Sequence, residues 1–216
     1  MAGLDGALPP ERIVLDGLYC RLEPVHPDHA ESLYAATTDD NGSRYRWLFD
    51  YPPASVDEMR AWIDMAMART DPLAFALVDR ATGQARGRQT LMRIAPKDGC
   101  IEIGGVLWGA GAAKTRLATE AVYLFARYVF DTLGYRRFEW KCNNDNAGSK
   151  QAALRLGFTF EGIFRQHMIQ KGRNRDTAWF AMLDGDWPAA RERFEAWLQP
   201  ENFDANGRQL QSLQRA

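Results

Sequence analysis

The fold class follows from residues 100–142, CIEIGGVLWGAGAAKTRLATEAVYLFARYVFDTLGYRRFEWKC. Residues 100–108 are typical of a strand, and residues 115–133 then place apolar side chains on one face at helical spacing. Gly134 ends this helix, and residues 136–142 return to the alternation of a strand. Because a strand–helix–strand crossover normally joins parallel neighbours, this stretch predicts one parallel pair of strands in the sheet.

The segments on either side predict a sheet that is otherwise antiparallel. Short turns such as Ala81-Thr82-Gly83 separate the strands before residue 100, as in a meander. The sequence therefore predicts an α/β (α+β) fold with a mixed, mostly antiparallel central sheet of about seven strands flanked by helices. The further strands expected are 17–24, 73–79, 85–94, 158–170 and 176–183, and the further helices are those opened by Pro27 and by Ser55, 146–156 and 188–198.

The domain organisation is expected to be simple. We predict one domain over residues 12–198 and terminal extensions at 1–11 and 199–216, because the sequence has no internal repeat and no linker with a shift in composition. Residues 1–16 are rich in glycine and proline and are expected to form a loose arm. The tail after Pro200 is polar.

Composition narrows the class of partner. The chain has 216 residues with 27 basic and 28 acidic side chains, so its net charge of -1 gives no electrostatic case for nucleic acid or an anionic membrane. The three cysteines are far apart and have no metal-ligand spacing, which is typical of reduced thiols. Residues 1–10 lack the features of a secretory signal, and no apolar run approaches the roughly 18 residues of a membrane helix. We expect a cytoplasmic protein.

Three stretches resemble the GNAT superfamily, most closely its RimJ/RimL-like N-acetyltransferases. They are WGAGAAKTRLATEA (108–121), CNNDNAGSKQAALRLGF (142–158) and EGIFRQHMIQKGRNRDTAWFAML (161–183). The resemblance spans residues 12–198. It implies that the parallel strand pair splays to admit CoA. It further implies an enzyme that transfers an acyl group, chiefly acetyl, from acyl-CoA to a primary amine of a small molecule or a protein N-terminus.

A pyrophosphate site is expected where the strand ending at Trp108 opens the next helix. A helix N-terminus offers free N–H groups and a positive dipole, and the small residues of this loop allow close approach. Lys114 and Arg116 would add formal charge. The predicted cofactor-binding residues here are Gly111, Ala112, Ala113, Lys114, Thr115, Arg116, Leu117, Ala118 and Thr119.

This loop departs from the family pattern, Gln/Arg-x-x-Gly-x-Gly/Ala. By spacing, the pattern falls on Ala113, Arg116 and Ala118, so the first polar residue and the middle glycine are missing. A side chain with a Cβ restricts a loop that needs positive φ. The alternative interpretation is an ordinary strand-to-helix connection with a solvated basic start.

The next helix carries the candidate general acid. The resemblance implies that Asn146 contacts the pantetheine arm and that Ser149 lies near the thioester sulfur, where a hydroxyl can protonate the departing thiolate. Many GNAT enzymes use a tyrosine at the position of Ala153, which cannot serve. The alternatives are that Asn146 is only a helix N-cap and Ser149 only a surface residue.

Glu102, on the strand before the loop, is the candidate general base, and it matches an acidic position common in this branch. An exposed cross-strand partner is the competing interpretation. Gly104 and Gly105 indicate a bulge or a close approach of backbone. In the family this strand's free N–H groups hold the thioester carbonyl and the pantetheine, with Val106 as the expected position.

The acceptor pocket is expected to use aromatic and polar side chains. Tyr45 and Trp47 lie in an aromatic loop with adjacent arginines, and His167 lies on a late strand, although packing or structural roles compete at all three. No histidine has a metal-ligand partner, so no metal is expected. The resemblance and the load of 7 Trp and 11 Phe suggest a homodimer. The alternative function is a non-catalytic module that binds acyl-CoA or scaffolds partners.

Overall fold

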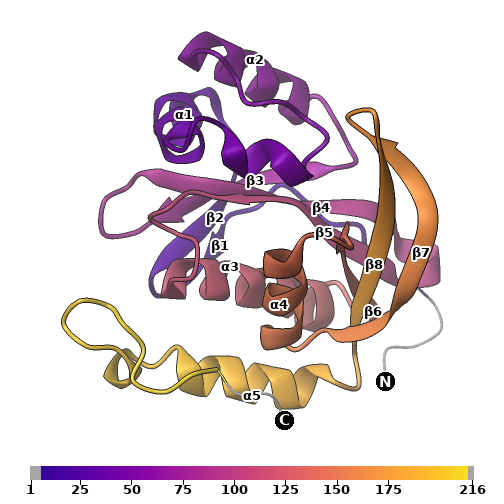
Figure 1. Cartoon of the computed structure of the whole chain (residues 1–216). Coiled ribbons are helices and arrows are strands. Elements are labelled where there is room, and N and C mark those ends of the chain that lie inside the picture. Colours follow the sequence, from indigo (N-terminus) through magenta and orange to yellow (C-terminus); the bar gives the residue numbers. More distant parts are fainter. Residues whose placement is uncertain (1–5, 214–216) are drawn as a thin grey trace.

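The computed structural model describes residues 6–213, in which eight strands form one sheet in the order β1-β2-β3-β4-β5-β6-β8-β7 (Figure 1). The strands are β1 (Leu15–Asp16), β2 (Cys20–Pro24), β3 (Leu73–Asp79), β4 (Ala85–Ala95), β5 (Cys100–Trp108), β6 (Arg137–Asn143), β7 (Thr159–Gln170) and β8 (Arg173–Leu183). The helices are α1 (Ala30–Thr38), α2 (Val56–Met67), α3 (Arg116–Arg127), α4 (Ala147–Arg155) and α5 (Trp187–Trp197). Short 3-10 helices lie at Pro27–His29, Ser43–Trp47, Pro96–Asp98 and Pro200–Asn202, and a π-helical turn at Tyr128–Thr132 extends α3.

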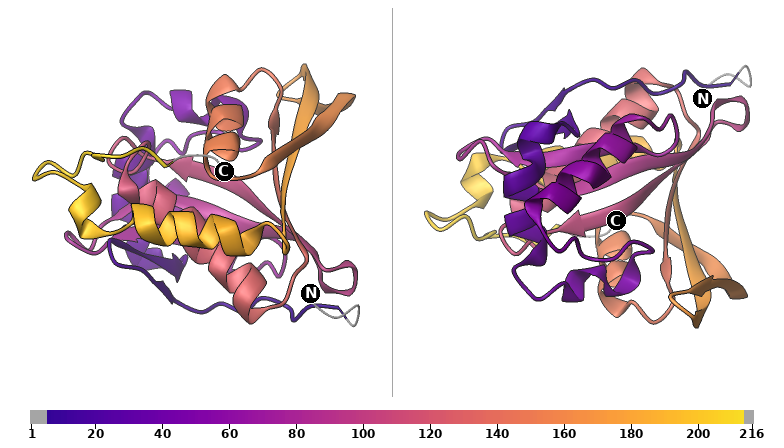
Figure 2. Two further views of the ribbon diagram at one scale, coloured as in Figure 1. Left: turned by 90° about the horizontal axis from the view of Figure 1, so that it is seen from below. Right: turned by 90° about the horizontal axis from the view of Figure 1, so that it is seen from above.

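Helices cover both faces of the sheet. Helices α1 and α2 lie on one face, and α3, α4 and α5 lie on the other (Figures 1 and 2). The larger core forms on the α3 side, where the rings of Phe75 on β3 and Phe125 on α3 meet edge to face with centroids 5.2 Å apart. A smaller core, which includes Leu33 and Ile63, packs α1 and α2 against the opposite face. The expected mixed sheet flanked by helices is confirmed.

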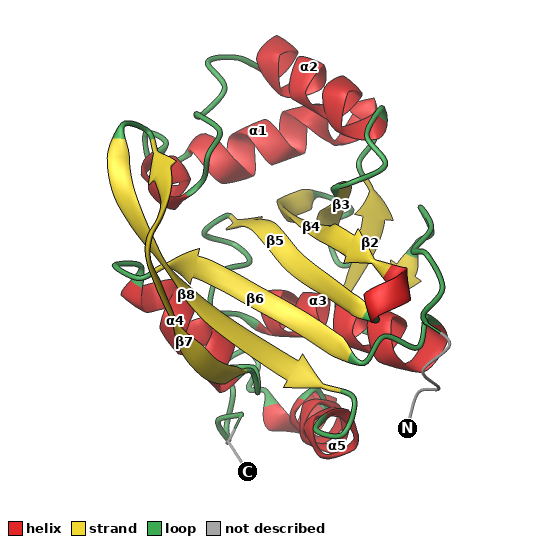
Figure 3. Ribbon diagram, turned by 90° about the vertical axis from the view of Figure 1, so that its right-hand side faces the viewer, coloured by secondary structure: helices red, strands yellow, loops and turns green. Residues whose placement is uncertain are grey.

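One pair of neighbouring strands, β5 and β6, runs parallel, and the other neighbouring pairs in residues 6–213 are antiparallel. The parallel pairing extends from Cys100 opposite Arg137 to Ile103 opposite Trp140. Beyond Ile103, β5 continues beside β4 while β6 continues beside β8, so the two strands separate (Figure 3). The expected crossover and its parallel pair are therefore present, and the separation opens the sheet at its centre.

Two glycines shape β5 at the point of separation. The register between β4 and β5 shifts between Arg88 and Thr90, opposite Gly104 and the residues after it, and Gly105 has a φ of 55°. A Cβ on Gly104 would lie 2.1 Å from the sulfur of Met92, so a larger residue there would require the Met92 side chain to move. The bulge predicted from the glycine pair is confirmed.

The segment before β2 differs from the loose arm that the sequence predicts. The N–H of Ala7 donates to the carbonyl of Pro96 and that of Leu8 to Leu133, each over 2.9 Å. The Arg12 guanidinium donates to the last carbonyls of α2, at Ala66 and Met67. Glycine and proline content signals irregular backbone but not mobility, and here the irregular chain is held by backbone partners. The two-residue β1 in this segment accounts for an eighth strand where about seven were expected.

The polar tail also packs onto the rest of the chain. Phe203 meets the rings of Tyr19 and Trp197 edge to face, and Leu213 is buried. The domain boundaries at residues 12 and 198 stay a prediction, because contacts alone do not divide the chain. In α2 the expected helix start at Ser55 is confirmed, because the Ser55 hydroxyl accepts the N–H of Glu58.

Candidate active site

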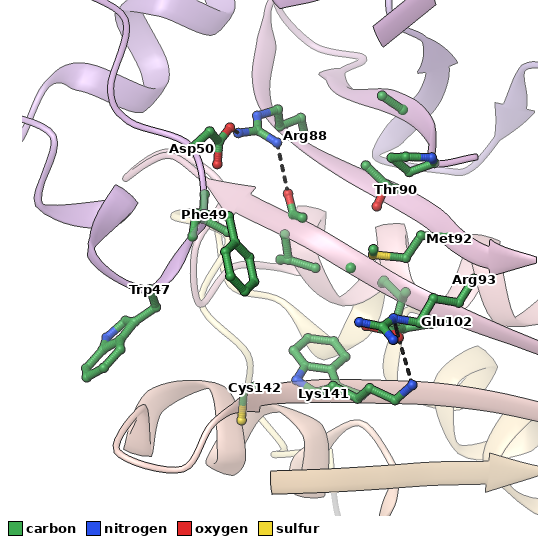
Figure 4. A pocket seen from close by; sticks show the side chains of 18 of the residues that line it. Trp47, Phe49, Asp50, Arg88, Thr90, Met92, Arg93, Glu102, Lys141 and Cys142 are labelled. Atoms are coloured by element: carbon green, nitrogen blue, oxygen red, sulfur yellow. Dashed lines mark hydrogen bonds and ion pairs between the residues drawn. The ribbon is translucent and has the colours of Figure 1, made fainter. Parts of the chain in front are cut away.

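A cavity of about 530 Å³ lies where β5 and β6 separate (Figure 4). Its lining comes from β4, β5 and β6, from residues 47–50 and α2 on one side, and from His167 and Arg175 of the β7–β8 hairpin on the other. A cavity of this size is typical of a site for a small organic molecule. Both residues expected to transfer protons, Glu102 and Ser149, line it.

Ser149 lies in the first turn of α4, at the mouth of the gap between β5 and β6. The loop after β6 ends at Asn146, whose Oδ1 accepts the N–H of Ser149 over 3.1 Å, so Asn146 is the N-cap of α4. The indole N–H of Trp140 on β6 donates to Ser149 Oγ over 2.9 Å. The surface alternative for Ser149 therefore does not describe this structure, since its hydroxyl faces the cavity. The capping alternative does describe Asn146, which does not line the cavity.

Glu102 is 5% exposed and lies between two cations. Its Oε2 is 2.9 Å from Arg93 Nε on β4 and 3.0 Å from Lys141 Nζ on β6. Burial raises the pKa of this carboxyl, and Lys141 and then Arg93 oppose the shift. Apart from these two ion pairs, Oε2 has no hydrogen bond of regular geometry within residues 6–213. The exposed cross-strand alternative is thus wrong, because β6 and the bulged β4 cover the carboxylate from both sides.

Lys141 links Glu102 to a second carboxylate. Its Nζ lies 2.6 Å from Glu139 Oε2 and 3.6 Å from the ring centroid of Trp179, and its side chain is 5% exposed. Glu139 in turn accepts from Arg137 Nε over 2.7 Å. These three residues alternate with the apolar residues of β6, and the face that they form is largely covered as well. The opposite charges of Glu102 and Glu139 offset the cost of burying the Lys141 ammonium group.

Arg88 is a second buried cation of the cavity, on the wall next to α2. Its guanidinium pairs with Asp50, donates to the carbonyl of Gly105 over 3.3 Å and stacks 4.2 Å from the ring of Trp62 (Figure 4). The contact with Gly105 links this cation to the bulge in β5. Arg88 thus ties the loop at residues 47–50 to the strand that borders the gap.

The loop between β5 and α3 presents open backbone donors. Thr115 caps α3 by accepting the N–H of Leu117 over 3.2 Å. Within the described residues, the N–H groups of Gly111, Lys114, Arg116 and Ala118 have no hydrogen-bond partner. Four unpaired donors at a helix N-terminus fit a pyrophosphate. The pyrophosphate of CoA therefore fits this loop despite the missing glycine.

The backbone angles of this loop show that the side chains of Ala113 and Arg116, where the family pattern is missing, do not strain it. Positive φ falls on Lys114, at 63°, and not on Ala113 or Arg116, which have ordinary backbone. Lys114 is exposed, so its charge is available to a ligand. The Arg116 guanidinium instead stacks 4.1 Å from the ring of Tyr19 and 5.3 Å from that of Phe203.

Two other predicted loop residues have protein partners. Ala112 is buried, and its carbonyl accepts the Thr115 hydroxyl over 2.7 Å. Thr119 is buried as well, with its hydroxyl donating to the Thr115 carbonyl and accepting from Arg155 Nη1 over 3.0 Å. Their contribution here is to shape the loop. Neither side chain has a polar group left free to form a hydrogen bond with a phosphate oxygen.

The predicted acceptor residues divide between the cavity and the core. Trp47 and His167 line the cavity, whereas Tyr45 is 2% exposed with its hydroxyl 3.2 Å from that of Thr37, so the packing interpretation holds for Tyr45. His167 Nδ1 lies 3.0 Å from Thr177 Oγ1. Burial lowers the pKa of His167, and the cations Arg93, Arg175 and Lys141 lower it further. Val106 lines the cavity on β5.

Sequence reasoning missed four cations of this site: Arg88, Arg93, Lys141 and Arg175. The only sequence signal for them is a charged residue in or beside a predicted strand, and solvated strand faces give the same signal. Cys142 also lines the cavity, and burial raises the pKa of its thiol, which the Ser149 side chain partly opposes. Within residues 6–213, no cluster of three or more His, Cys, Asp or Glu side chains could hold a metal ion. Nor does any helix of this part of the chain have the length and apolar character to cross a membrane.

Comparison with known proteins identifies the family and the fold. The profile of the Acetyltransferase (GNAT) domain matches residues 20–159, which contain the splayed strand pair, the loop and Ser149. The chain belongs to the GNAT acetyltransferase family. A GCN5-related N-acetyltransferase from Brucella melitensis is 51% identical, with a TM-score of 0.94 over 97% of this chain and 96% of that chain.

Other relatives agree with this assignment. A probable GNAT acetyltransferase from Chromobacterium violaceum is 36% identical, with a TM-score of 0.80 over 87% of this chain and 94% of that one. The uncharacterized N-acetyltransferase YoaA of Bacillus subtilis is 25% identical, over 75% of this chain and 92% of its own length. This GNAT chain is therefore an N-acetyltransferase that takes its acyl group from acetyl-CoA.

More distant GNAT structures show the same fold with cofactor bound. RimL in complex with coenzyme A is 19% identical with a TM-score of 0.67, and the self-immunity acetyltransferase MccE in complex with acetyl-CoA and AMP is 21% identical with a TM-score of 0.69. GNAT neighbours thus bind acetyl-CoA or CoA, and family members act on amine acceptors.

Proposed function

We propose that this GNAT enzyme acetylates a primary amine that binds in the 530 Å³ cavity, in a ternary complex with acetyl-CoA. The observation that carries the proposal is that a carboxylate and a hydroxyl, Glu102 on β5 and Ser149 on α4, line the same cavity at the β5–β6 gap. An acyl transfer to an amine needs one group to take a proton and one to give a proton. A module that only binds acyl-CoA has no need of such a pair.

Acetyl-CoA would be held along the gap, with its pyrophosphate at the α3 loop. The open N–H groups of Gly111, Lys114, Arg116 and Ala118 support this position, as does the exposed charge of Lys114. The unpaired edge of β5 beyond Ile103, which includes Val106, would accept the pantetheine arm. When bound, the cosubstrate supplies a thioester, from which acetyl is transferred.

Glu102 is the proposed general base. An amine arrives mainly as an ammonium ion, which has no lone pair for attack. Glu102 lines the cavity, and its Oε1 would accept that proton, directly or through a water. Arg93 and Lys141 hold the other oxygen, Oε2, and so fix the direction of the carboxylate. The neutral amine then forms the new C–N bond at the acetyl carbon.

Ser149 is the proposed general acid. As the C–S bond breaks, the sulfur gains the electron pair and needs a proton. The Trp140 indole can only donate, so Ser149 Oγ accepts from it and the hydroxyl proton is left for the sulfur. Solvent would restore that proton. Glu102 returns the ammonium proton to solvent, and the nitrogen loses a second proton as the amide forms. The net products are therefore the N-acetyl amine, CoA thiol and one released proton.

The same proposal includes the branch of the family, the cellular location and the oligomeric state of the protein. We infer a RimJ/RimL-like enzyme on the basis of Asn146, Ser149 and the Leu156-Gly157-Phe158 segment that follows them. We infer a cytoplasmic location on the basis of the widely spaced cysteines, which are free thiols. We also infer a homodimer, because the edge strand β7 exposes the apolar side chains of Ile163, Phe164 and Ile169. Unpaired apolar edges are normally covered.

Release of free CoA thiol tests the proposal. Purified protein is incubated with acetyl-CoA and a panel of amino acids, diamines, amino sugars and peptides, and thiol is followed with a chromogenic disulfide. Amine-dependent release with a matching N-acetyl product in the mass spectrum is expected. Tight acetyl-CoA binding without amine-dependent release across the panel would favour the non-catalytic module.

A further inference from the structure

The cavity contains a buried guanidinium that the reaction scheme does not use. Arg175 on β8 is 8% exposed and lines the cavity beside Cys142, Asn143 and Thr177. Its Nε donates to Thr177 Oγ1 over 3.3 Å, and the Phe49 ring lies 5.1 Å from its central carbon. Both terminal nitrogens, Nη1 and Nη2, lack a hydrogen-bond partner in residues 6–213.

Arg175 differs in this respect from the other buried cations of the cavity. Arg88 pairs with Asp50, and Lys141 pairs with Glu102 and Glu139. Even the half-exposed Arg93 pairs with Glu102. Within the described part of the chain, no carboxylate lies in ion-pair contact with Arg175. A buried charge without a counter-ion is costly, so its counter-charge is expected to come from a ligand.

The residues around Arg175 restrict the directions from which that ligand can approach the guanidinium. Phe49 covers the guanidinium and Thr177 occupies Nε, so the free donors are those of the terminal nitrogens. Two terminal N–H groups in one plane match the two oxygens of a carboxylate. His167 shares the Thr177 hydroxyl, and its lowered pKa keeps it neutral near pH 7.

CoA itself does not account for this cation. The open donors of the pyrophosphate loop belong to residues 111–118, and none of these residues lines the cavity that contains Arg175. The part of the cosubstrate expected near Ser149 is the thioester, which carries no charge. The partner of Arg175 therefore belongs to the acceptor.

We propose that Arg175 binds the carboxylate of a small amine acceptor, so that the enzyme acetylates a free amino acid or a related amino carboxylate. This inference rests on the proposed function and adds the chemical class of its substrate. Arg175 on β8 would hold the carboxylate while Glu102 on β5 faces the amine, since both line one cavity. The 530 Å³ volume suits a small molecule better than a folded protein.

The test compares each acceptor with its own carboxamide. α-Amino and ω-amino acids are assayed beside the corresponding amides in the thiol-release assay, with wild-type enzyme, Arg175→Gln, Arg175→Lys and the control Arg173→Gln. Arg173 is an exposed arginine on the same strand, outside the cavity. Thermal unfolding of each variant confirms that it folds.

The wild-type enzyme is expected to favour the carboxylates through KM. Arg175→Gln should raise KM for the carboxylates by about 10–100-fold, the loss expected for a charged hydrogen-bonded pair, and leave KM for the amides unchanged. Arg175→Lys should recover part of this difference because it keeps the charge but not the planar pair of donors. Arg173→Gln should resemble the wild type.

Binding is measured independently of turnover by calorimetry with N-acetyl amino acids and their amides. Preferential binding of the carboxylates that Arg175→Gln abolishes would support the proposal even for a slow enzyme. Equal KM and affinity for acids and amides would overturn it, as would acetylation of peptides but of no free amino acid. Absence of thiol release with every amine would instead contradict the proposed function. The two failures are therefore distinguishable.

Discussion

The indole N–H of Trp140 donates a hydrogen bond of 2.9 Å to Oγ of Ser149. This contact joins β6 to the first turn of α4 beside the gap through which the thioester is proposed to reach the cavity. An indole nitrogen never accepts, so the direction of the bond is settled by chemistry. The hydroxyl proton of Ser149 is consequently directed to another acceptor, such as a departing sulfur.

Ser149→Ala should therefore lower kcat by roughly 10–1000-fold and leave the affinity for acetyl-CoA nearly unchanged. Proton donation acts on the leaving thiolate in the transition state, which ground-state binding hardly senses. Single-turnover kinetics and calorimetry with acetyl-CoA measure the two quantities. Trp140→Phe is the matched control, since it removes the indole donor but keeps both the ring and the hydroxyl, and its kcat should fall less. Wild-type turnover in Ser149→Ala would exclude the hydroxyl as the acid.

Glu102→Gln should give a defect that depends on pH. The folded carboxyl has a raised pKa because of burial, so in the wild type kcat/KM falls as pH drops through that pKa and the base becomes protonated. Glutamine cannot accept the proton at any pH, and the variant depends on amine that is already neutral. Its defect should therefore shrink as pH rises toward the pKa of the amine. The pH profile of kcat/KM tests this, with Glu161→Gln as a control outside the cavity. A defect of constant size at all pH values would exclude Glu102 as the base.

Lys114→Glu should weaken acetyl-CoA binding by about tenfold or more, because it reverses a charge beside the open amides of the loop. Lys97→Glu is the matched control, also an exposed lysine in a short turn, and should bind normally. Lys114→Gly separates charge from backbone, since glycine adopts the positive φ without strain. Calorimetry at two salt concentrations measures all three. Equal affinity of the two glutamate variants would move the pyrophosphate away from this loop.

Glu120→Gln should destabilise the protein by roughly 2–4 kcal/mol, because a buried carboxylate there accepts three backbone N–H groups. These belong to Leu18, Tyr19 and Cys20, at 2.6, 2.8 and 2.7 Å. The amide of glutamine would turn one acceptor into a donor that faces other donors. Urea unfolding measures the loss, with the exposed Glu192→Gln as control. An unchanged midpoint would show that the turn before β2 does not depend on this charge.

Light scattering should give a mass near twice the 24.5 kDa of the chain at micromolar concentration. Ile169→Lys, at the most exposed large apolar side chain of β7, should shift the protein toward the monomer without loss of fold. Circular dichroism verifies the fold. A wild-type mass near 24.5 kDa would contradict the homodimer.

Most of the fold could be predicted because its signals are local. The apolar segments at residues 73–79 and 100–108, with turn sequences between the strands of this region, were sufficient to place β3 and β5 with their observed bounds. The small-residue loop and the change to helical spacing located α3, and Gly104 with Gly105 marked the bulge. Each of these features depends on the backbone preferences of a few neighbouring residues, which the sequence carries directly.

Candidate residues with a specific motif could also be proposed from the sequence. Ser149 and Glu102 were named from resemblance and both line the cavity. Tyr45 was indistinguishable from Trp47 in the sequence, because both are aromatic residues beside arginines. Only the fold places the Tyr45 hydroxyl against Thr37 in the core and leaves Trp47 at the cavity.

The amino-acid sequence thus determined which segments become strands and helices, where the chain crosses over, and which motif opens α3. The tertiary structure alone decided the electrostatics of the site. Lys141 and Arg175 lie 34 positions apart in the sequence, and on their own each predicts only a solvated strand face. Pairing of β6 with β8 brings both to one cavity, where Lys141 finds two carboxylates and Arg175 finds none. Whether a charge is paired depends on contacts between distant segments, which no local pattern records.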